Sequence, residues 1–126
     1  IPPVVKEGFA YIRQHVPKNG LILYPEENLI LYTERRVIWS AAEVYISSKR
    51  GSLDKLFWAS DNEGMNSFLK VNGIDHILIK KTRIYDDTKA HHLGGYPKSF
   101  VERLPQLEGW QKAYENPGVT LWKKSL

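Results

Sequence analysis

Two adjacent histidines, His91 and His92, stand in a polar stretch of this chain, five residues after the acidic pair Asp86-Asp87. Imidazole is a common metal ligand and a proton acceptor near neutral pH, so a loop-borne cation site is one interpretation. However, neighbouring side chains point in different directions, and the helical i, i+4 spacing that places two imidazoles on one metal is missing. A solvated polar loop explains the same residues, and we therefore expect no metal and no cofactor.

Two further charged pairs could do chemistry. Glu26-Glu27 could supply a general acid and a general base, because close carboxylates can be driven to different pKa values. Their place before a short apolar run also suits plain complementarity to a helix dipole. Arg35-Arg36 could grip a phosphate or a carboxylate, although an arginine pair in a water-facing turn is the commoner case. Gly94-Gly95 belongs to no phosphate loop, since neither glycine-rich nucleotide motif occurs in the chain.

Aromatic and basic residues could form a binding surface for sugars, nucleotides or anions. Most of the 4 Trp and 7 Tyr sit in apolar segments, where core packing is their natural role, but Tyr85, Tyr96 and Trp58 are candidates for exposed rings. Five cations lie around Tyr85: Lys80, Lys81, Arg83, Lys89 and Lys98. The candidate contacts to a ligand or acceptor are Arg35, Arg36, Arg83, Tyr85, His91, His92 and Tyr96. We assign no catalytic residue.

Length and composition limit what these residues can belong to. A chain of 126 residues is long enough for one core, so we expect a single α/β domain over residues 1–126. The lack of cysteine excludes a thiolate nucleophile and a Cys-ligated zinc. The longest apolar runs have four residues, far below the roughly 20 that cross a bilayer. A net charge of +4 from scattered cations, without an aromatic and basic RNA-binding run, predicts no nucleic-acid partner.

The elements that position these side chains begin with a helix over residues 4–16. Its apolar residues recur at helical spacing, from Val5 through Phe9 and Ile12 to Val16, and a Pro-Lys-Asn-Gly turn ends it. The unbroken apolar run 21–24 then has the length of a strand buried on both faces. This order of helix, turn and buried strand is typical of layered α/β domains.

A second long helix is expected after residue 60. Ser60 and Glu63 have the spacing of a capping box, and Gly73 stands where a left-handed residue ends a helix. The apolar run 76–79 that follows predicts another strand, parallel to the first across a right-handed crossover. The segments between these elements favour a short helix near 28–32, a strand at 37–39 and helical spacing over 53–57.

The last third of the chain combines a loop with short elements. Residues 80–96 have little apolar content and predict a long surface loop, after which Pro97 at N1 opens a short helix. Pro117 and Gly118 supply the turn of a hairpin over 110–123, whose strands should add antiparallel at a sheet edge. The predicted fold class is α/β: a layered mixed sheet with parallel core strands, flanking helices and a C-terminal antiparallel hairpin.

Five groups of residues, spread over nearly the whole chain, form a further pattern. They are Tyr11-Ile12-Arg13 with Val16-Pro17-Lys18-Asn19-Gly20-Leu21-Ile22-Leu23, Pro25-Glu26, Tyr32-Thr33 with Arg35-Arg36-Val37, Asn72-Gly73-Ile74-Asp75-His76-Ile77-Leu78-Ile79, and Tyr114-Glu115-Asn116-Pro117-Gly118-Val119-Thr120-Leu121-Trp122-Lys123. In this order the chain resembles the C-terminal soluble domain of polytopic membrane glycosyltransferases that use a lipid-phosphate sugar donor, such as dolichyl-phosphate-mannose-protein mannosyltransferases. It departs from that pattern at Glu34, where such proteins often have Gly, and at His76, where they usually have an aromatic residue.

The resemblance implies a non-catalytic accessory domain on the extracytoplasmic side, tethered through Pro2-Pro3 to membrane helices upstream. Proteins of this kind carry their catalytic carboxylate on a loop near the first membrane helices, so no catalytic residue is carried over. The implied partner is the membrane portion of the same polypeptide, with the acceptor substrate or the lipid-linked sugar as a further contact.

Two other functions stay open at this level. A freestanding basic binding module for anionic ligands or nucleic acid would use the cations between residues 80 and 98. A small hydrolase or transferase would work through Asp86, Asp87, His91 and His92.

Overall fold

The computed structural model of the protein describes residues 1–39, 49–90 and 94–125. The helices are α1 (Pro3–His15), α2 (Asn28–Thr33), α4 (Lys49–Phe57), α5 (Asn62–Val71) and α7 (Lys98–Arg103), with 3-10 turns η1 (Lys81–Arg83) and η2 (Leu104–Gln106). The strands are β1 (Leu21–Leu23), β2 (Arg36–Ile38), β3 (His76–Lys80), β4 (Ile84–Tyr85), β5 (Tyr96–Pro97), β6 (Trp110–Glu115) and β7 (Val119–Lys124). Within the described ranges, no helix is both long and apolar enough to cross a membrane.

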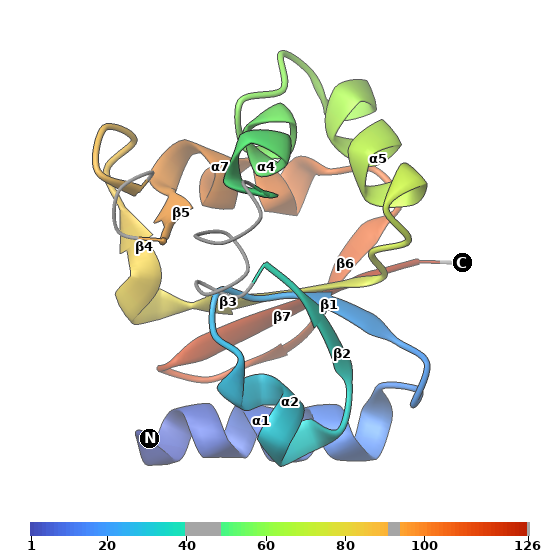
Figure 1. The fold of residues 1–126 in the computed structure, drawn as a ribbon, viewed down its shortest axis with the longest axis vertical. Helices are drawn as coiled ribbons and strands as arrows, with labels where there is room; N and C mark the ends of the chain where they lie inside the picture. Colours follow the sequence, from blue (N-terminus) through green and yellow to red (C-terminus); the bar gives the residue numbers. More distant parts are fainter. Residues whose placement is uncertain (40–48, 91–93, 126) are drawn as a thin grey trace.

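Five of the strands form a mixed sheet in the order β2-β1-β3-β7-β6 (Figure 1). Strand β1 pairs parallel with both β2 and β3, so that Ile22 lies opposite Val37 on one side and His76 on the other. The hairpin β6–β7 adds antiparallel to β3 and leaves β6 at the edge. The predicted fold class is confirmed, including the parallel core strands and the antiparallel C-terminal hairpin. The structure adds a second, two-stranded parallel sheet, β4–β5.

Helices α1 and α2 lie on one face of the large sheet, and α4, α5 and α7 lie on the other (Figure 1). Each face has its own apolar cluster. On the first face, the residues that the helical spacing predicted are buried: Val5, Phe9 and Ile12 in α1, and Val16 at its C-cap. The predicted short helix near 28–32 is also present as α2, of which only Leu29 and Thr33 are buried.

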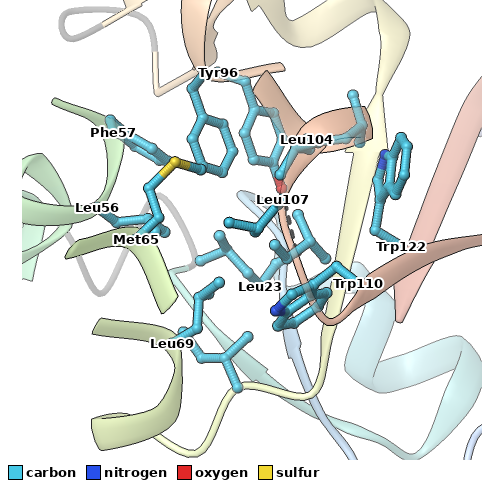
Figure 2. Packing of buried hydrophobic residues seen from close by; sticks show 14 of the residues in the cluster. Leu23, Leu56, Phe57, Met65, Leu69, Tyr96, Leu104, Leu107, Trp110 and Trp122 are labelled. Carbon is cyan, nitrogen blue, oxygen red and sulfur yellow. Dashed lines mark hydrogen bonds between the residues drawn. The ribbon is translucent and has the colours of Figure 1, made fainter. Parts of the chain in front are cut away.

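The larger cluster lies between the sheet and the helices of the second face. Figure 2 shows Leu23 from β1 together with Met65 and Leu69 from α5, Tyr96 from β5 and Trp110 from β6. The residues named here come from four elements, β1, α5, β5 and β6, each of which is short. This cluster therefore fixes the smaller sheet and α7 against the strands that carry the polar residues described below.

Three local predictions need correction. Helix α5 is capped by Asp61 and not by Ser60. The backbone of Asp61 is extended, and its carboxylate accepts a hydrogen bond from the backbone N–H of Gly64 at 2.8 Å. Pro97 is the N-cap residue of α7 and not its first helical residue. The stretch 80–96 is not a plain surface loop in its described part, because η1, β4 and the buried Ala90 attach it to the protein.

Candidate functional site

The carboxyl ends of β1 and β3 mark the place where the chain turns to opposite faces of the sheet. After β1 the chain leads to α2, beside α1, whereas after β3 it leads through η1 and β4 to the other face (Figure 1). The strand order β2-β1-β3 makes this position the topological switch point of the sheet. In open α/β sheets ligands bind at this position, so its polar residues are the first candidates for a functional site.

Glu26 is the centre of the polar residues at this edge. Lys80, the last residue of β3, donates from Nζ to both carboxylate oxygens of Glu26, at 2.9 and 3.1 Å. A guanidinium nitrogen of Arg83 lies 3.2 Å from Oε1 of the same carboxylate. The hydroxyl of Tyr24 donates to Oε2 at 3.4 Å. The side chains of Glu26 and Lys80 are only 18% and 15% exposed, so water and salt screen their interaction weakly.

These neighbours decide the protonation state of Glu26. Burial opposes ionisation of the carboxyl, but the hydrogen bond and charge of Lys80, together with the charge of Arg83, outweigh it and hold the pKa below its ordinary value. A carboxylate that stays ionised cannot donate a proton at neutral pH, and its low basicity makes it a poor general base. Glu26 therefore bridges two segments of chain electrostatically, a role that neither interpretation of the Glu26-Glu27 pair included.

Tyr96 lies at the same junction and is fully buried, which corrects the expectation of an exposed ring. Its hydroxyl is 2.6 Å from the backbone carbonyl oxygen of Leu78 and 3.1 Å from that of Leu23. Figure 2 shows the ring within the apolar cluster near Leu23. Burial raises the pKa of the Tyr96 hydroxyl well above its ordinary value. Tyr96 thus links the end of β1 to the middle of β3, next to the last residue pair of their ladder.

Trp39, the residue directly after β2, adds a strained backbone to this edge. Its φ of 72° lies in the left-handed region, which costs on the order of 1–2 kcal/mol for a residue with a Cβ atom. The indole is fully buried, with its ring centroid 5.4 Å from that of Phe57 and 5.0 Å from that of Tyr96. Strain that packing holds in place concentrates at functional sites. No signal in the sequence marks Trp39 in this way.

The predicted arginine pair does not act as a pair. Arg35 is buried, and its guanidinium donates to three backbone carbonyl oxygens, those of Val16 at 2.9 Å, Thr33 at 2.7 Å and Arg13 at 3.0 Å. It therefore ties the end of α1 to the end of α2. Arg36 begins β2 with an exposed side chain and donates to a carbonyl oxygen in the turn before β1, at 2.6 Å. The two guanidinium groups serve different parts of the framework.

The remaining candidate contacts in the described residues are Arg83 and Tyr85. Arg83 belongs to the Glu26 cluster. Tyr85 in β4 is partly buried, and its ring packs so closely over Gly95 that a Cβ atom there would lie 2.0 Å from it. His91 and His92 lie outside the described residues. Of the predicted contacts that belong to the described residues, Arg83 and Tyr96 are therefore the two that lie at the switch point.

The acidic pair Asp86-Asp87 organises backbone. Asp86 accepts hydrogen bonds from the hydroxyl and the backbone N–H of Thr88, which lower the pKa of its carboxyl, and Asp87 accepts the N–H of Ser99 in the first turn of α7. Both acids line an open hollow of about 620 Å³ whose rim carries charges of both signs. Over residues 1–39, 49–90 and 94–125, no three potential metal-ligating side chains gather.

Four of the five cations that the sequence places around Tyr85 have an acidic neighbour. Lys80 and Arg83 contact Glu26, Lys81 contacts Glu115 at 3.0 Å, and Lys89 lies 3.9 Å from Asp86. A surface that attracts nucleic acid or other polyanions needs cations that dominate their surroundings. This pairing argues against a freestanding module that binds anions through these residues.

No protein-family model and no curated protein sequence matches the chain. Two solved structures resemble it from end to end. The C-terminal globular domain of the oligosaccharyltransferase AfAglB-S2 from Archaeoglobus fulgidus superposes with a TM-score of 0.71 and 12% identity, over 99% of each chain. A second C-terminal globular domain of oligosaccharyltransferase from the same organism gives a TM-score of 0.63 and 13% identity, over 99% of this chain and 97% of that one. The chain therefore has the fold of oligosaccharyltransferase C-terminal globular domains.

Proposed function

We propose that this chain is the non-catalytic, extracytoplasmic accessory domain of an integral-membrane glycosyltransferase that takes sugar from a lipid-phosphate donor. The observation that supports this most is the end-to-end likeness to the C-terminal globular domain of oligosaccharyltransferase, over 99% of each chain. If the two proteins shared only a fragment of a common fold, some elements of one chain would have no counterpart in the other. The order of the motifs along the chain favours the membrane glycosyltransferases that use dolichyl-phosphate-mannose as donor.

The polar residues at the switch point support a role in binding or bracing. Glu26 is kept ionised by Lys80 and Arg83, and the Tyr96 hydroxyl is engaged with two carbonyl oxygens. Proton transfer would require these groups to give up such partners. A rigid edge of this kind suits contact with an acceptor that a separate catalytic centre modifies, and Arg83, whose side chain is 37% exposed, is its most accessible charge.

The first test is the coding sequence upstream of Ile1. The proposal requires it to encode several apolar stretches of about 20 residues, the length that crosses a bilayer. A start codon directly before Ile1, with nothing hydrophobic upstream, would contradict the tether.

The second test separates a catalytic from an accessory role. Membranes that contain the complete polypeptide should transfer sugar from a polyprenyl-phosphate donor, whereas the purified chain of residues 1–126 should transfer none. Membranes that contain the polypeptide without these residues should show reduced transfer. Turnover by the isolated chain would overturn the proposal.

A further inference from the structure

Helix α2 exposes three consecutive apolar side chains. Ile30 is 44% exposed, Leu31 81% and Tyr32 41%, and we call these three residues the α2 ridge. Among the described residues, the other large apolar side chains that are exposed are scattered singly, at Ile1, Trp58 and Val71. Single exposed apolar residues are ordinary, whereas a contiguous group marks a surface that something else covers.

The α2 ridge cannot be buried by a small movement of its own helix. Leu29 and Thr33 already occupy the buried side of α2, and the Thr33 hydroxyl donates to the Leu29 carbonyl oxygen at 2.6 Å. The ring of Tyr32 stacks on that of Phe9 in α1, with centroids 5.8 Å apart. Arg35 fixes the end of α2 to α1 through backbone carbonyls. The ridge is therefore a rigid feature of the α1–α2 layer.

Exposed charged residues occur on α1 and at both ends of α2. Lys6 and Arg13 lie about one turn before and after Phe9 on α1, the residue whose ring stacks on Tyr32, and both are exposed. Arg36 is exposed at the start of β2. The exposed carboxylates of Glu27 and Glu34 stand at the two ends of α2. An apolar apex with a tyrosine on its flank and long cationic side chains around it matches the layered chemistry of a bilayer interface.

The position of the proposed tether is a second reason to expect that the α2 ridge faces the membrane. The N-terminus lies in the α1–α2 layer, at the start of α1 (Figure 1). A chain held to the membrane on its N-terminal side would present this layer to the lipid. We infer that the α2 ridge is the membrane-facing surface of the domain, with Ile30 and Leu31 inserted among the lipid headgroups and Tyr32 at the polar boundary. This inference rests on the proposed function.

The contact is small. Membrane binding scales with the apolar area that is inserted, and even a single acyl chain holds a protein only marginally. Three side chains therefore do not recruit a free protein to lipid. They orient a domain that is already attached, and the experiment has to supply the attachment.

The chain contains no cysteine, so a single engineered cysteine can carry an environment-sensitive nitrobenzoxadiazole label. Leu31→Cys places the label on the ridge. Val71→Cys is the matched control, because Val71 on α5 is also 81% exposed but lies on the other face of the sheet. Ala10→Cys on the exposed side of α1 tests whether another part of the same layer faces the lipid. Each variant is attached through an N-terminal His tag to phosphatidylcholine–phosphatidylglycerol vesicles that contain a nickel-chelating lipid.

The label at position 31 should gain about twofold or more in emission and shift to the blue when vesicles are added, because insertion removes water from the fluorophore. Labels at positions 10 and 71 should change little. Adding Ile30→Asp to the Leu31→Cys variant should abolish the gain. Circular dichroism checks that each variant is folded.

Several outcomes would overturn the inference. No gain at position 31, or an equal gain at positions 10 or 71, would show that the ridge does not face lipid. A gain that rises with protein concentration in the absence of vesicles would show that a second copy covers the ridge. If upstream membrane segments exist but the label stays in water, the proposed function stands and this inference falls.

Discussion

Lys80 donates hydrogen bonds to both carboxylate oxygens of Glu26, which lies 54 positions earlier in the sequence. The two side chains are largely buried, so removal of one leaves the other charge without its partner. We predict that Glu26→Gln lowers the free energy of unfolding by about 1–3 kcal/mol in urea denaturation at pH 7. Glu27→Gln, which changes the exposed neighbour, should alter it by less than about 0.5 kcal/mol. Equal effects of the two substitutions would contradict this assignment.

The same pair predicts a dependence on acid pH. The pKa of Glu26 in the folded protein lies below its ordinary value of 4.5, so its ionisation stabilises the fold above that pH. This contribution is lost as the pH falls from 4.5 through the folded pKa. The difference in unfolding free energy between wild type and Glu26→Gln should therefore be largest near neutral pH and shrink in acid. A constant difference would mean that the carboxylate charge does not stabilise the fold.

Tyr96 predicts a dependence on alkaline pH. Burial raises its pKa well above 10.0, so the folded protein keeps the hydroxyl neutral while the unfolded chain ionises it. Stability that is present below pH 10 should therefore decline as the pH rises further. Tyr96→Phe should cost about 1–2 kcal/mol at pH 8, because the carbonyl oxygens of Leu23 and Leu78 lose their donor.

Denaturation at a series of pH values from 8 to 11 should also show a shallower alkaline decline for Tyr96→Phe than for wild type. Tyr32→Phe, in an exposed ring, is the control and should change the stability at pH 8 by less than about 0.5 kcal/mol. An unchanged alkaline slope in Tyr96→Phe would show that other groups cause the decline.

Glu34 predicts a stabilising substitution. It ends α2 in the left-handed conformation, with φ 56°, and its N–H bonds to the Ile30 carbonyl oxygen at 2.9 Å. Glycine adopts this conformation without the strain of a Cβ atom, although it also gains entropy in the unfolded chain. Glu34→Gly should raise the free energy of unfolding by about 0.5–1 kcal/mol, measured by thermal denaturation. Glu34→Ala removes the carboxylate but keeps the Cβ atom, and should bring no such gain.

For Gly8 we expect a substitution by Ala to destabilise the protein, which is the opposite of what helix propensity predicts. Replacement by Ala inside a helix normally stabilises by about 1 kcal/mol. Here, however, the added Cβ atom would lie 2.6 Å from Cγ2 of the buried Val119 in β7. Gly8→Ala should therefore destabilise the protein by about 1–2 kcal/mol, because overpacking exceeds the helical gain. Adding Val119→Ala to the Gly8→Ala variant should restore its stability if the two side chains clash. A Gly8→Ala variant that is more stable than wild type would contradict the close approach.

Elements whose signals are local can be predicted from the amino-acid sequence alone. Helix α1 follows from apolar spacing, and the hairpin β6–β7 follows from the chemistry of Pro117 and Gly118. Strands β1 and β3 follow from short apolar runs bounded by turns. The capping pattern predicts the start of α5 to within one residue, because Ser60 and Asp61 are both good N-cap residues.

The polar site at the switch point depends on contacts that form only in the folded protein. Glu26 meets Lys80 because β1 and β3 pair in parallel and Glu26 follows shortly after β1, and Tyr96 is buried because β5 and α7 pack over the larger sheet. Trp39, whose backbone is in the left-handed region, packs its ring against Phe57 and Tyr96, which belong to other elements. Spacing along a chain reports contacts within a few residues, whereas these contacts join segments up to 73 positions apart, whose proximity depends on the whole sheet order.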